Sequence, residues 1–141
     1  MAHGYSIKGL SSLQSKLKKL TELFKEAVKN LYPKRKLIGC LELHTFSSLD
    51  KKFLPQYKGA LKACDQGIVY FDPEKVKNKN LPAISEDNVK TAFADSNLKV
   101  FTETEKLSAF LKSQSWGNTN LLMMSSGHFG GLNVTELISK N

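Results

Sequence analysis

The stretch KLIGCLELHTFSS, residues 36–48, indicates the fold most directly. Its first eight residues, Lys36 to Leu43, form a short apolar run soon after a proline, which is typical of a buried β-strand. The polar residues that follow, His44 to Ser48, have the composition of a loop. A strand that is apolar on both faces is typical of a parallel sheet that is covered on both sides.

The same pattern recurs three times further along the chain. GIVYF (residues 67–71), LKVF (98–101) and TNLLMMS (119–125) are short apolar runs of the length expected for buried strands. The first of them ends in Asp72-Pro73, and the last runs into a loop with three glycines, GHFGG (127–131). The sequence therefore predicts four strands.

Segments with helical periodicity separate these runs. The strongest covers residues 12–31, with apolar residues at steps of three and four (Leu13, Leu17, Leu20, Phe24, Ala27, Val28 and Leu31). Further helices are predicted at about 49–64, 85–94, 102–111 and 134–139. The polar, proline-interrupted interval 76–84 is expected to be a surface excursion.

The alternation of helices and strands predicts the fold class. Because crossovers between parallel strands are right-handed, helices cover both faces of such a sheet. We expect an α/β protein: a three-layer α/β/α Rossmann-like sandwich with a mainly parallel sheet, formed by residues 12–141. Residues 1–11 are expected to be a disordered arm or an expression remnant.

Composition is that of one ordinary globular domain. The chain has 141 residues, of which 40% are apolar and 24% charged, so disordered and collagen-like chains are excluded. No run approaches 18 apolar residues, and no membrane contact is expected. Cys40 and Cys64 lie in apolar contexts and are expected to be reduced and buried, as is typical of a cytoplasmic protein.

The charge is concentrated at one end. Residues 1–36 hold nine basic and two acidic residues, which makes +7 of the total of +8, and the remaining 105 residues carry only +1. A basic helix of this kind is either a solvated face or a surface that attracts nucleic acid or anionic lipid. The chain lacks the interleaved aromatic residues of single-strand binders, which disfavours nucleic acid.

Candidate binding residues follow the predicted strands. In an open parallel sheet, ligands bind beyond the carboxyl ends of the strands. The residues at those ends are His44, Thr45, Ser47, Ser48, Asp72, Ser125, Ser126, Gly127 and His128. The histidines and cysteines have no metal-ligand spacing, and no phosphate-binding G-x-x-x-x-G-K-[ST] loop is present. No catalytic residue and no metal site are predicted.

Two of these strand ends resemble a known family. LELHTFSSL (residues 41–49), followed by Phe53 and by Ala63-Cys64-Asp65, resembles a strand, loop and helix of the third domain of the Mur ligases. LLMMSSGHFGG (121–131) resembles the closing strand and glycine-rich loop of that domain. The chain is most similar to the members that act on UDP-N-acetylmuramate itself and add L-alanine or a peptide.

The resemblance implies a function in peptidoglycan synthesis or recycling. Mur ligases use ATP to convert a carboxylate into an acyl phosphate, which the incoming amine attacks as phosphate leaves. The third domain is a lid that binds the amino acid or peptide. ATP and Mg²⁺ would be bound mainly by a central domain outside these 141 residues. We therefore expect this chain alone to hold no cofactor and to be inactive, and its strand-end residues to bind substrate.

Three departures from the family pattern concern the site. The D-[YF]-A-H-x-P motif that precedes the first helix in the family has no counterpart near Leu10 to Ser15. Thr45 and Ser48 stand where the family loop carries basic residues, so an arginine clamp on an anionic substrate is missing or is supplied elsewhere. His128 stands where asparagine is usual.

Two alternatives remain open at this point. The first is a basic Rossmann-like binding module for nucleic acid or anionic ligands. The second is the lid domain of a folylpolyglutamate synthase-like ligase, against which the histidine loop after the first strand argues.

Overall fold

The protein, described here as a computed structural model, contains a five-stranded sheet. The structure describes residues 3–7, 26, 33–125 and 128–133. The strands are ordered β1-β5-β2-β3-β4, and each neighbouring pair runs parallel. They are β1 (His3–Ile7), β2 (Lys36–Leu43), β3 (Gln66–Phe71), β4 (Lys99–Phe101) and β5 (Thr119–Met124). The prediction of an α/β fold with a mainly parallel sheet is confirmed, and β2 has the predicted bounds.

The two central strands are buried on both faces. All six residues of β5 and seven of the eight residues of β2 are buried. Because side chains alternate across a strand, β2 contributes to two separate cores. Leu41 and Leu43 lie in one apolar cluster, and Ile38 and Cys40 lie in the other.

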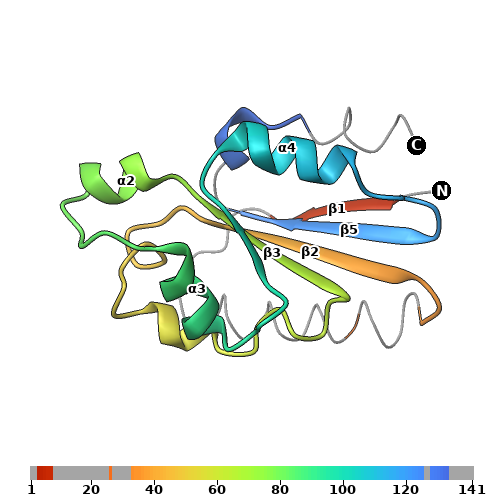
Figure 1. Cartoon of the computed structure of the whole chain (residues 1–141), viewed down its shortest axis with the longest axis horizontal. Helices are drawn as coiled ribbons and strands as arrows, with labels where there is room; N and C mark the ends of the chain where they lie inside the picture. Colours follow the sequence, from red (N-terminus) through yellow and green to blue (C-terminus); the bar gives the residue numbers. More distant parts are fainter. Residues whose placement is uncertain (1–2, 8–25, 27–32, 126–127, 134–141) are drawn as a thin grey trace.

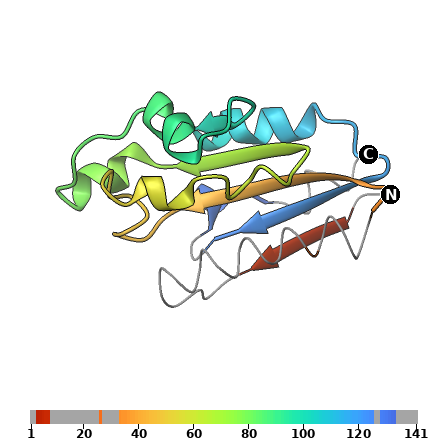
Figure 2. The ribbon, with the colours of Figure 1, turned by 90° about the horizontal axis from the view of Figure 1, so that it is seen from below.

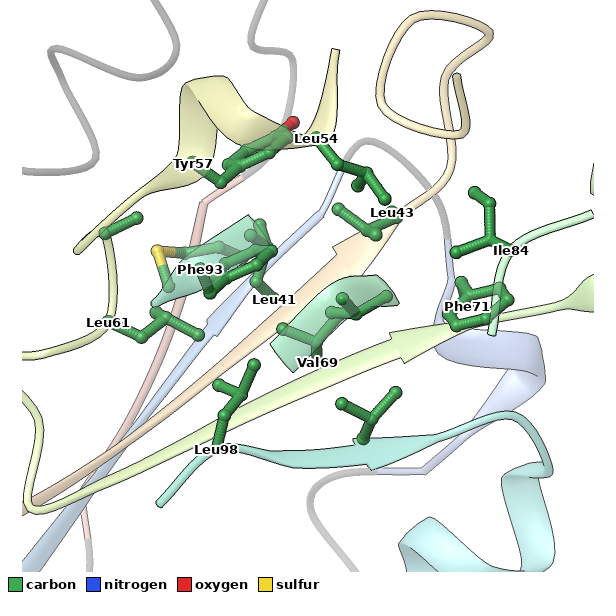
Figure 3. Packing of buried hydrophobic residues seen from close by; sticks show 14 of the residues in the cluster. Leu41, Leu43, Leu54, Tyr57, Leu61, Val69, Phe71, Ile84, Phe93 and Leu98 are labelled. Carbon is green, nitrogen blue, oxygen red and sulfur yellow. The ribbon is translucent and has the colours of Figure 1, made fainter. Parts of the chain in front are cut away.

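Helical elements cover each face, which gives three layers (Figure 1). The 3-10 helix η2 (Leu54–Tyr57) and helix α3 (Glu86–Phe93) cover the face of Leu41 and Leu43. Figure 3 shows this core, in which side chains from η2 and α3 pack on those of β2 and β3. Helix α4 (Thr104–Lys112) and the 3-10 helix η3 (Phe129–Gly131) cover the opposite face. The three-layer prediction is confirmed.

Strand β1 corrects the prediction for the N-terminal residues. His3–Ile7 pairs with β5 at the edge of the sheet, from His3 opposite Asn120 to Ile7 opposite Met124. The prediction of a disordered arm over residues 1–11 is therefore wrong for these five residues. HGYSI is too short and too polar for its pattern to indicate a strand. Residues His3–Ile7 form a strand because they pair with β5, whose edge presents backbone N–H and C=O groups that need hydrogen-bond partners.

The predicted helix over residues 49–64 is also wrong. In its place the chain makes a series of turns around η2. Pro55 has no N–H to donate inside a helix, and Gly59 has a φ of +75°, outside the range of a right-handed helix. Leu54 and Tyr57 are still buried, so the apolar spacing correctly indicates the buried side chains but not the backbone that carries them.

The interval after β3 is more regular than predicted. Helix α2 (Pro73–Asn78) covers the start of the segment that was expected to be a surface excursion. Pro73 occupies the first turn of the helix. Backbone N–H groups in the first turn have no acceptor within a helix, so a proline there costs no hydrogen bond. The predicted helices over residues 12–31 and 134–139 lie outside the described residues, apart from Glu26.

The helices predicted near 85–94 and 102–111 are confirmed as α3 and α4. Ser85 caps α3 in a capping box with Asn88, as its position before the apolar residues predicts. Glu103 precedes α4 and makes no side-chain hydrogen bond to its first turn. Within the part of the chain that the structure describes, no helix combines the length and apolar character needed to cross a bilayer.

Both cysteines are free thiols. Cys40 is fully buried in β2, whereas Cys64 is half-buried rather than buried as predicted. Burial raises the pKa of both thiols well above the ordinary value. Neither is therefore a thiolate nucleophile at neutral pH.

Candidate functional site

The carboxyl ends of β2, β3 and β5 lie at one edge of the sheet. The register places Leu43 beside Phe71 and Leu41 beside Met124, so the loops that begin at His44, Asp72 and Ser125 leave the sheet together. Figure 2 shows these strands pointing the same way, with α2 beyond their tips. The prediction that the polar strand ends share one edge is confirmed. We refer to residues 44–48, Asp72, Ser125, residues 128–131 and Lys75 as the strand-end site.

His44 contacts a lysine that the sequence pattern did not single out. Lys75, in α2, places its Nζ 3.1 Å from His44 Nδ1, and both side chains are half-buried. A lysine ammonium has only protons to donate, so Nδ1 accepts and the imidazole proton is on Nε2. His44 therefore has one N–H left to donate.

The charges around His44 favour its neutral form. Burial lowers the pKa of His44 most, and the nearby charge of Lys75 lowers the pKa further. Lys79 and His128 act in the same direction, while Glu42 opposes them. Lys75 forms no ion pair with any carboxylate of the described residues. The site thus presents a half-buried cation that is held by a neutral imidazole.

A titration of His44 by NMR tests this arrangement. We expect its midpoint to lie below 6.5, the ordinary value for histidine. Replacing Lys75 with methionine should raise the midpoint, because the positive charge that disfavours imidazolium is removed. Lys77→Met is the matched control on the same helix, since Lys77 is exposed and does not perturb His44. Equal midpoints in the two variants would contradict the contact.

Thr45 and Ser48 shape the loop after β2. The Ser48 N–H donates to Thr45 Oγ1 over 3.2 Å, and the Ser48 hydroxyl donates to the Thr45 carbonyl over 3.0 Å. The two hydroxyls are also 3.0 Å apart and hydrogen-bonded. Ser48 is buried, so these groups hold the turn rather than face solvent. Ser47 is half-buried in the same turn, and Phe46 projects outward with 55% of its surface exposed.

Asp72 caps the helix that carries Lys75. Its Oδ1 accepts from the Glu74 N–H over 3.0 Å at the start of α2. A capping carboxylate at this position satisfies an N–H group that has no partner in the helix. Asp72 thereby orients the first turn and the Lys75 within it. This is a structural contribution to the site, in addition to the predicted contact with substrate.

The loop after β5 is only partly described. Ser125 is buried, and its hydroxyl donates to Glu42 Oε1. His128 is exposed and close enough to His44 to lower the pKa of that imidazole. Ser126 and Gly127 lie outside the described residues. The ends of three of the four predicted strands, β2, β3 and β5, are thus brought together. The contacts of Ser126 and Gly127 stay predictions.

Sequence reasoning missed Glu42 and Lys75. Glu42 is only 6% exposed, and it is the only acidic residue in a strand whose other interior positions are apolar. A charged residue in a strand that is buried on both faces signals a partner elsewhere in the fold. Lys75 gives a weaker signal, because a lysine on a short polar helix is usually solvated.

The described residues do not fit the metal or the phosphates that an ATP-dependent ligase requires. They contain no group of three or more His, Cys, Asp or Glu side chains arranged to hold a metal ion. The sequence likewise contains no phosphate-binding loop. The chemistry that these residues can supply is hydrogen bonding and positive charge for an anionic group.

Comparison with known proteins finds a similar fold in domains of ligases. No protein-family model and no curated protein matches the sequence. Among solved structures, the chain is similar to a domain of a Haemophilus ducreyi protein described as a UDP-N-acetylmuramate:L-alanyl-gamma-D-glutamyl-meso-diaminopimelate ligase. The TM-score is 0.60 and the identity 15%, over 99% of this chain and 90% of that domain. This chain has the fold of that ligase domain.

Two longer ligases contain the same fold. UDP-N-acetylmuramate-alanine ligase MurC of Thermotoga maritima matches 98% of this chain with a TM-score of 0.58 and 16% identity. A murein peptide ligase of Psychrobacter arcticus matches 86% of it with a TM-score of 0.55 and 14% identity. The chain spans only 27% and 25% of the lengths of these two proteins. At such identities the comparison establishes the shared fold.

Proposed function

We propose that the chain is the lid domain of an ATP-dependent Mur ligase, which joins UDP-N-acetylmuramate to L-alanine or a peptide in peptidoglycan synthesis or recycling. The observation that carries the proposal is the strand-end site itself. Polar loops meet at one edge of a sheet with a lysine that has no carboxylate partner among the described residues, in a fold shared with ligase domains over nearly the whole chain. Ligands of open parallel sheets bind at this edge.

The chain contributes binding and orientation of the amine substrate. Lys75 supplies the positive charge for a carboxylate of the incoming amino acid or peptide, and neutral His44 donates its Nε2–H beside it. In this role Lys75 replaces the basic loop residues whose positions are occupied by Thr45 and Ser48. A lysine offers a point charge rather than the two-pronged contact of an arginine. Selection among carboxylates therefore depends also on the surrounding loops.

The remaining parts of the reaction are assigned to other domains. ATP and Mg²⁺, which activate the carboxylate of UDP-N-acetylmuramate, would be bound mainly by a central domain that these 141 residues do not include. The lid would close over the activated carboxylate, hold the amine against it and exclude water. The setting is the cytoplasm, and the isolated chain would not catalyse ligation.

A ligation assay tests this function. The complete gene product is incubated with UDP-N-acetylmuramate, ATP and Mg²⁺, and with either L-alanine or a tripeptide whose N-terminal amine is free. We expect amide product with one of the amines and none with the 141-residue chain alone. A complete protein that neither binds UDP-N-acetylmuramate nor forms product with either amine would overturn the assignment.

A further inference from the structure

Glu42 ties together two loops of the strand-end site. Its carboxylate is buried in β2, where an uncompensated charge would be costly. Oε1 accepts two hydrogen bonds, from the Ser125 hydroxyl and from the Phe129 N–H over 3.0 Å. Both donors belong to the segment after β5, whereas Glu42 lies two residues before His44. A single carboxylate thus joins the strand end that presents His44 to the neighbouring loop.

The loop that Glu42 holds has an unusual backbone. Phe129, Gly130 and Gly131 have φ values of +52°, +65° and +85°, so three consecutive residues are left-handed. For a residue with a side chain this conformation costs roughly 1–2 kcal/mol. Such strain persists only where surrounding contacts determine the conformation. The Phe129 N–H bond to Glu42 is one of those contacts.

The other contacts come from the opposite side of the loop. The buried Phe129 ring lies 6.3 Å from the Tyr70 ring, centroid to centroid. Gly130 passes so close to Thr104 that a Cβ atom there would lie 2.2 Å from Thr104 Oγ1. Thr104 and Tyr70 are themselves hydrogen-bonded through their hydroxyls. The loop is therefore held between Glu42 and the Tyr70–Thr104 pair.

We propose that Glu42 is a positioning residue, which keeps the loop after β5 in its left-handed conformation and so fixes that loop relative to His44. Glu42 does not contact substrate in this proposal, because its carboxylate is buried and engaged. For its effect on substrate binding the inference rests on the proposed function; for its effect on the loop it rests on the contacts alone.

Amide hydrogen exchange of the chain, measured by NMR, tests the loop. In Glu42→Ala, exchange at Phe129 should accelerate at least about tenfold, the equivalent of one charged hydrogen bond, with faster exchange at Gly131 and Leu132 as well. Glu42→Gln keeps the shape of the side chain and one acceptor oxygen. Its exchange rate at Phe129 should lie between those of Glu42→Ala and the native chain. Glu74→Ala, an exposed residue of α2, is the control and should leave the loop unchanged.

Two results would overturn the proposal. One is unchanged protection at Phe129 in Glu42→Ala. The other is an equal loss of protection in the loop and in β2 and β3 in both Glu42 variants, because Glu42 would then support the whole fold rather than this loop. If the Ala variant does not fold, the Gln variant decides in its place, and unchanged protection at Phe129 in Glu42→Gln would then overturn the proposal.

The ligase assay provides a second readout. In the complete enzyme, Glu42→Gln should raise the KM for the amine substrate about tenfold while kcat changes less than about twofold, since orientation of the binding loop is lost. A wild-type KM in this variant would overturn the role in substrate binding. Absence of ligation in the wild type would instead refute the proposed function, and the exchange experiment would still decide the role of Glu42 in the loop.

Discussion

Replacing Gly130 with alanine should destabilise the protein by about 2–5 kcal/mol, because two unfavourable effects coincide there. The left-handed φ of +65° disfavours any side chain, and the added Cβ would lie 2.2 Å from Thr104 Oγ1 and 2.7 Å from the Tyr70 hydroxyl. The loop must move away from both partners to accept the methyl group. Urea unfolding of the purified variant measures the loss of stability.

Gly131 is the matched control for this substitution. Its φ is +85°, but an added Cβ would meet no atom within 4 Å. Gly131→Ala should therefore cost only the conformational part, roughly 1–2 kcal/mol. If the two alanine variants are equally stable, the close approach of Gly130 to Thr104 and Tyr70 does not exist in solution.

Replacing Phe93 with alanine should cost about 3–5 kcal/mol of the free energy of unfolding, as is typical for a buried phenylalanine. Phe93 ends α3, is fully buried, and stacks on Tyr57 with ring centroids 5.2 Å apart (Figure 3). Its carbonyl also accepts a hydrogen bond from the Gly59 N–H over 2.9 Å. Because single domains are stable by only about 5–15 kcal/mol, this variant should lose a large share of its stability.

Phe46 provides the contrast. It is the one large apolar side chain that is exposed among the described residues, with 55% of its surface accessible. Phe46→Ala should change the free energy of unfolding by no more than about 0.5 kcal/mol. Thermal or urea unfolding of both variants makes the comparison. If the loss of stability in Phe93→Ala is as small as that expected for Phe46→Ala, Phe93 is not in the core.

Strands β2 to β5 were predictable because their signal is local. Each predicted strand is a short run whose residues are apolar on both faces, and burial on both faces is what a central parallel strand requires. The turns over residues 49–64 were mistaken for a helix because Leu54, Tyr57 and Leu61 have helical spacing. Their burial depends on the sheet below, whereas Pro55 and Gly59 determine the backbone.

Strand β1 was not predictable in the same way. Nothing within His3–Ile7 requires an extended conformation, and the strand exists because the edge of β5 accepts it. Such pairing joins residues that are more than a hundred positions apart in the sequence. A local pattern carries no information about it.

The site was predictable in outline only. The rule that parallel strands end at one edge correctly grouped His44, Asp72 and Ser125. It could not assign their contacts: Thr45 and Ser48 bond to each other, and Asp72 caps a helix. Lys75 gives the site its charge, and Glu42 holds its shape. Both act through side-chain contacts with residues of other elements, which a local sequence pattern does not indicate.

The most direct measurement of the central claim is the KM for the amine substrate in the complete ligase carrying Lys75→Met, beside Lys77→Met. If the strand-end site binds a carboxylate through Lys75, the first variant should raise this KM at least about tenfold, the equivalent of one charged hydrogen bond, and the second should leave it unchanged. Equal and native KM values in the two variants would contradict the account.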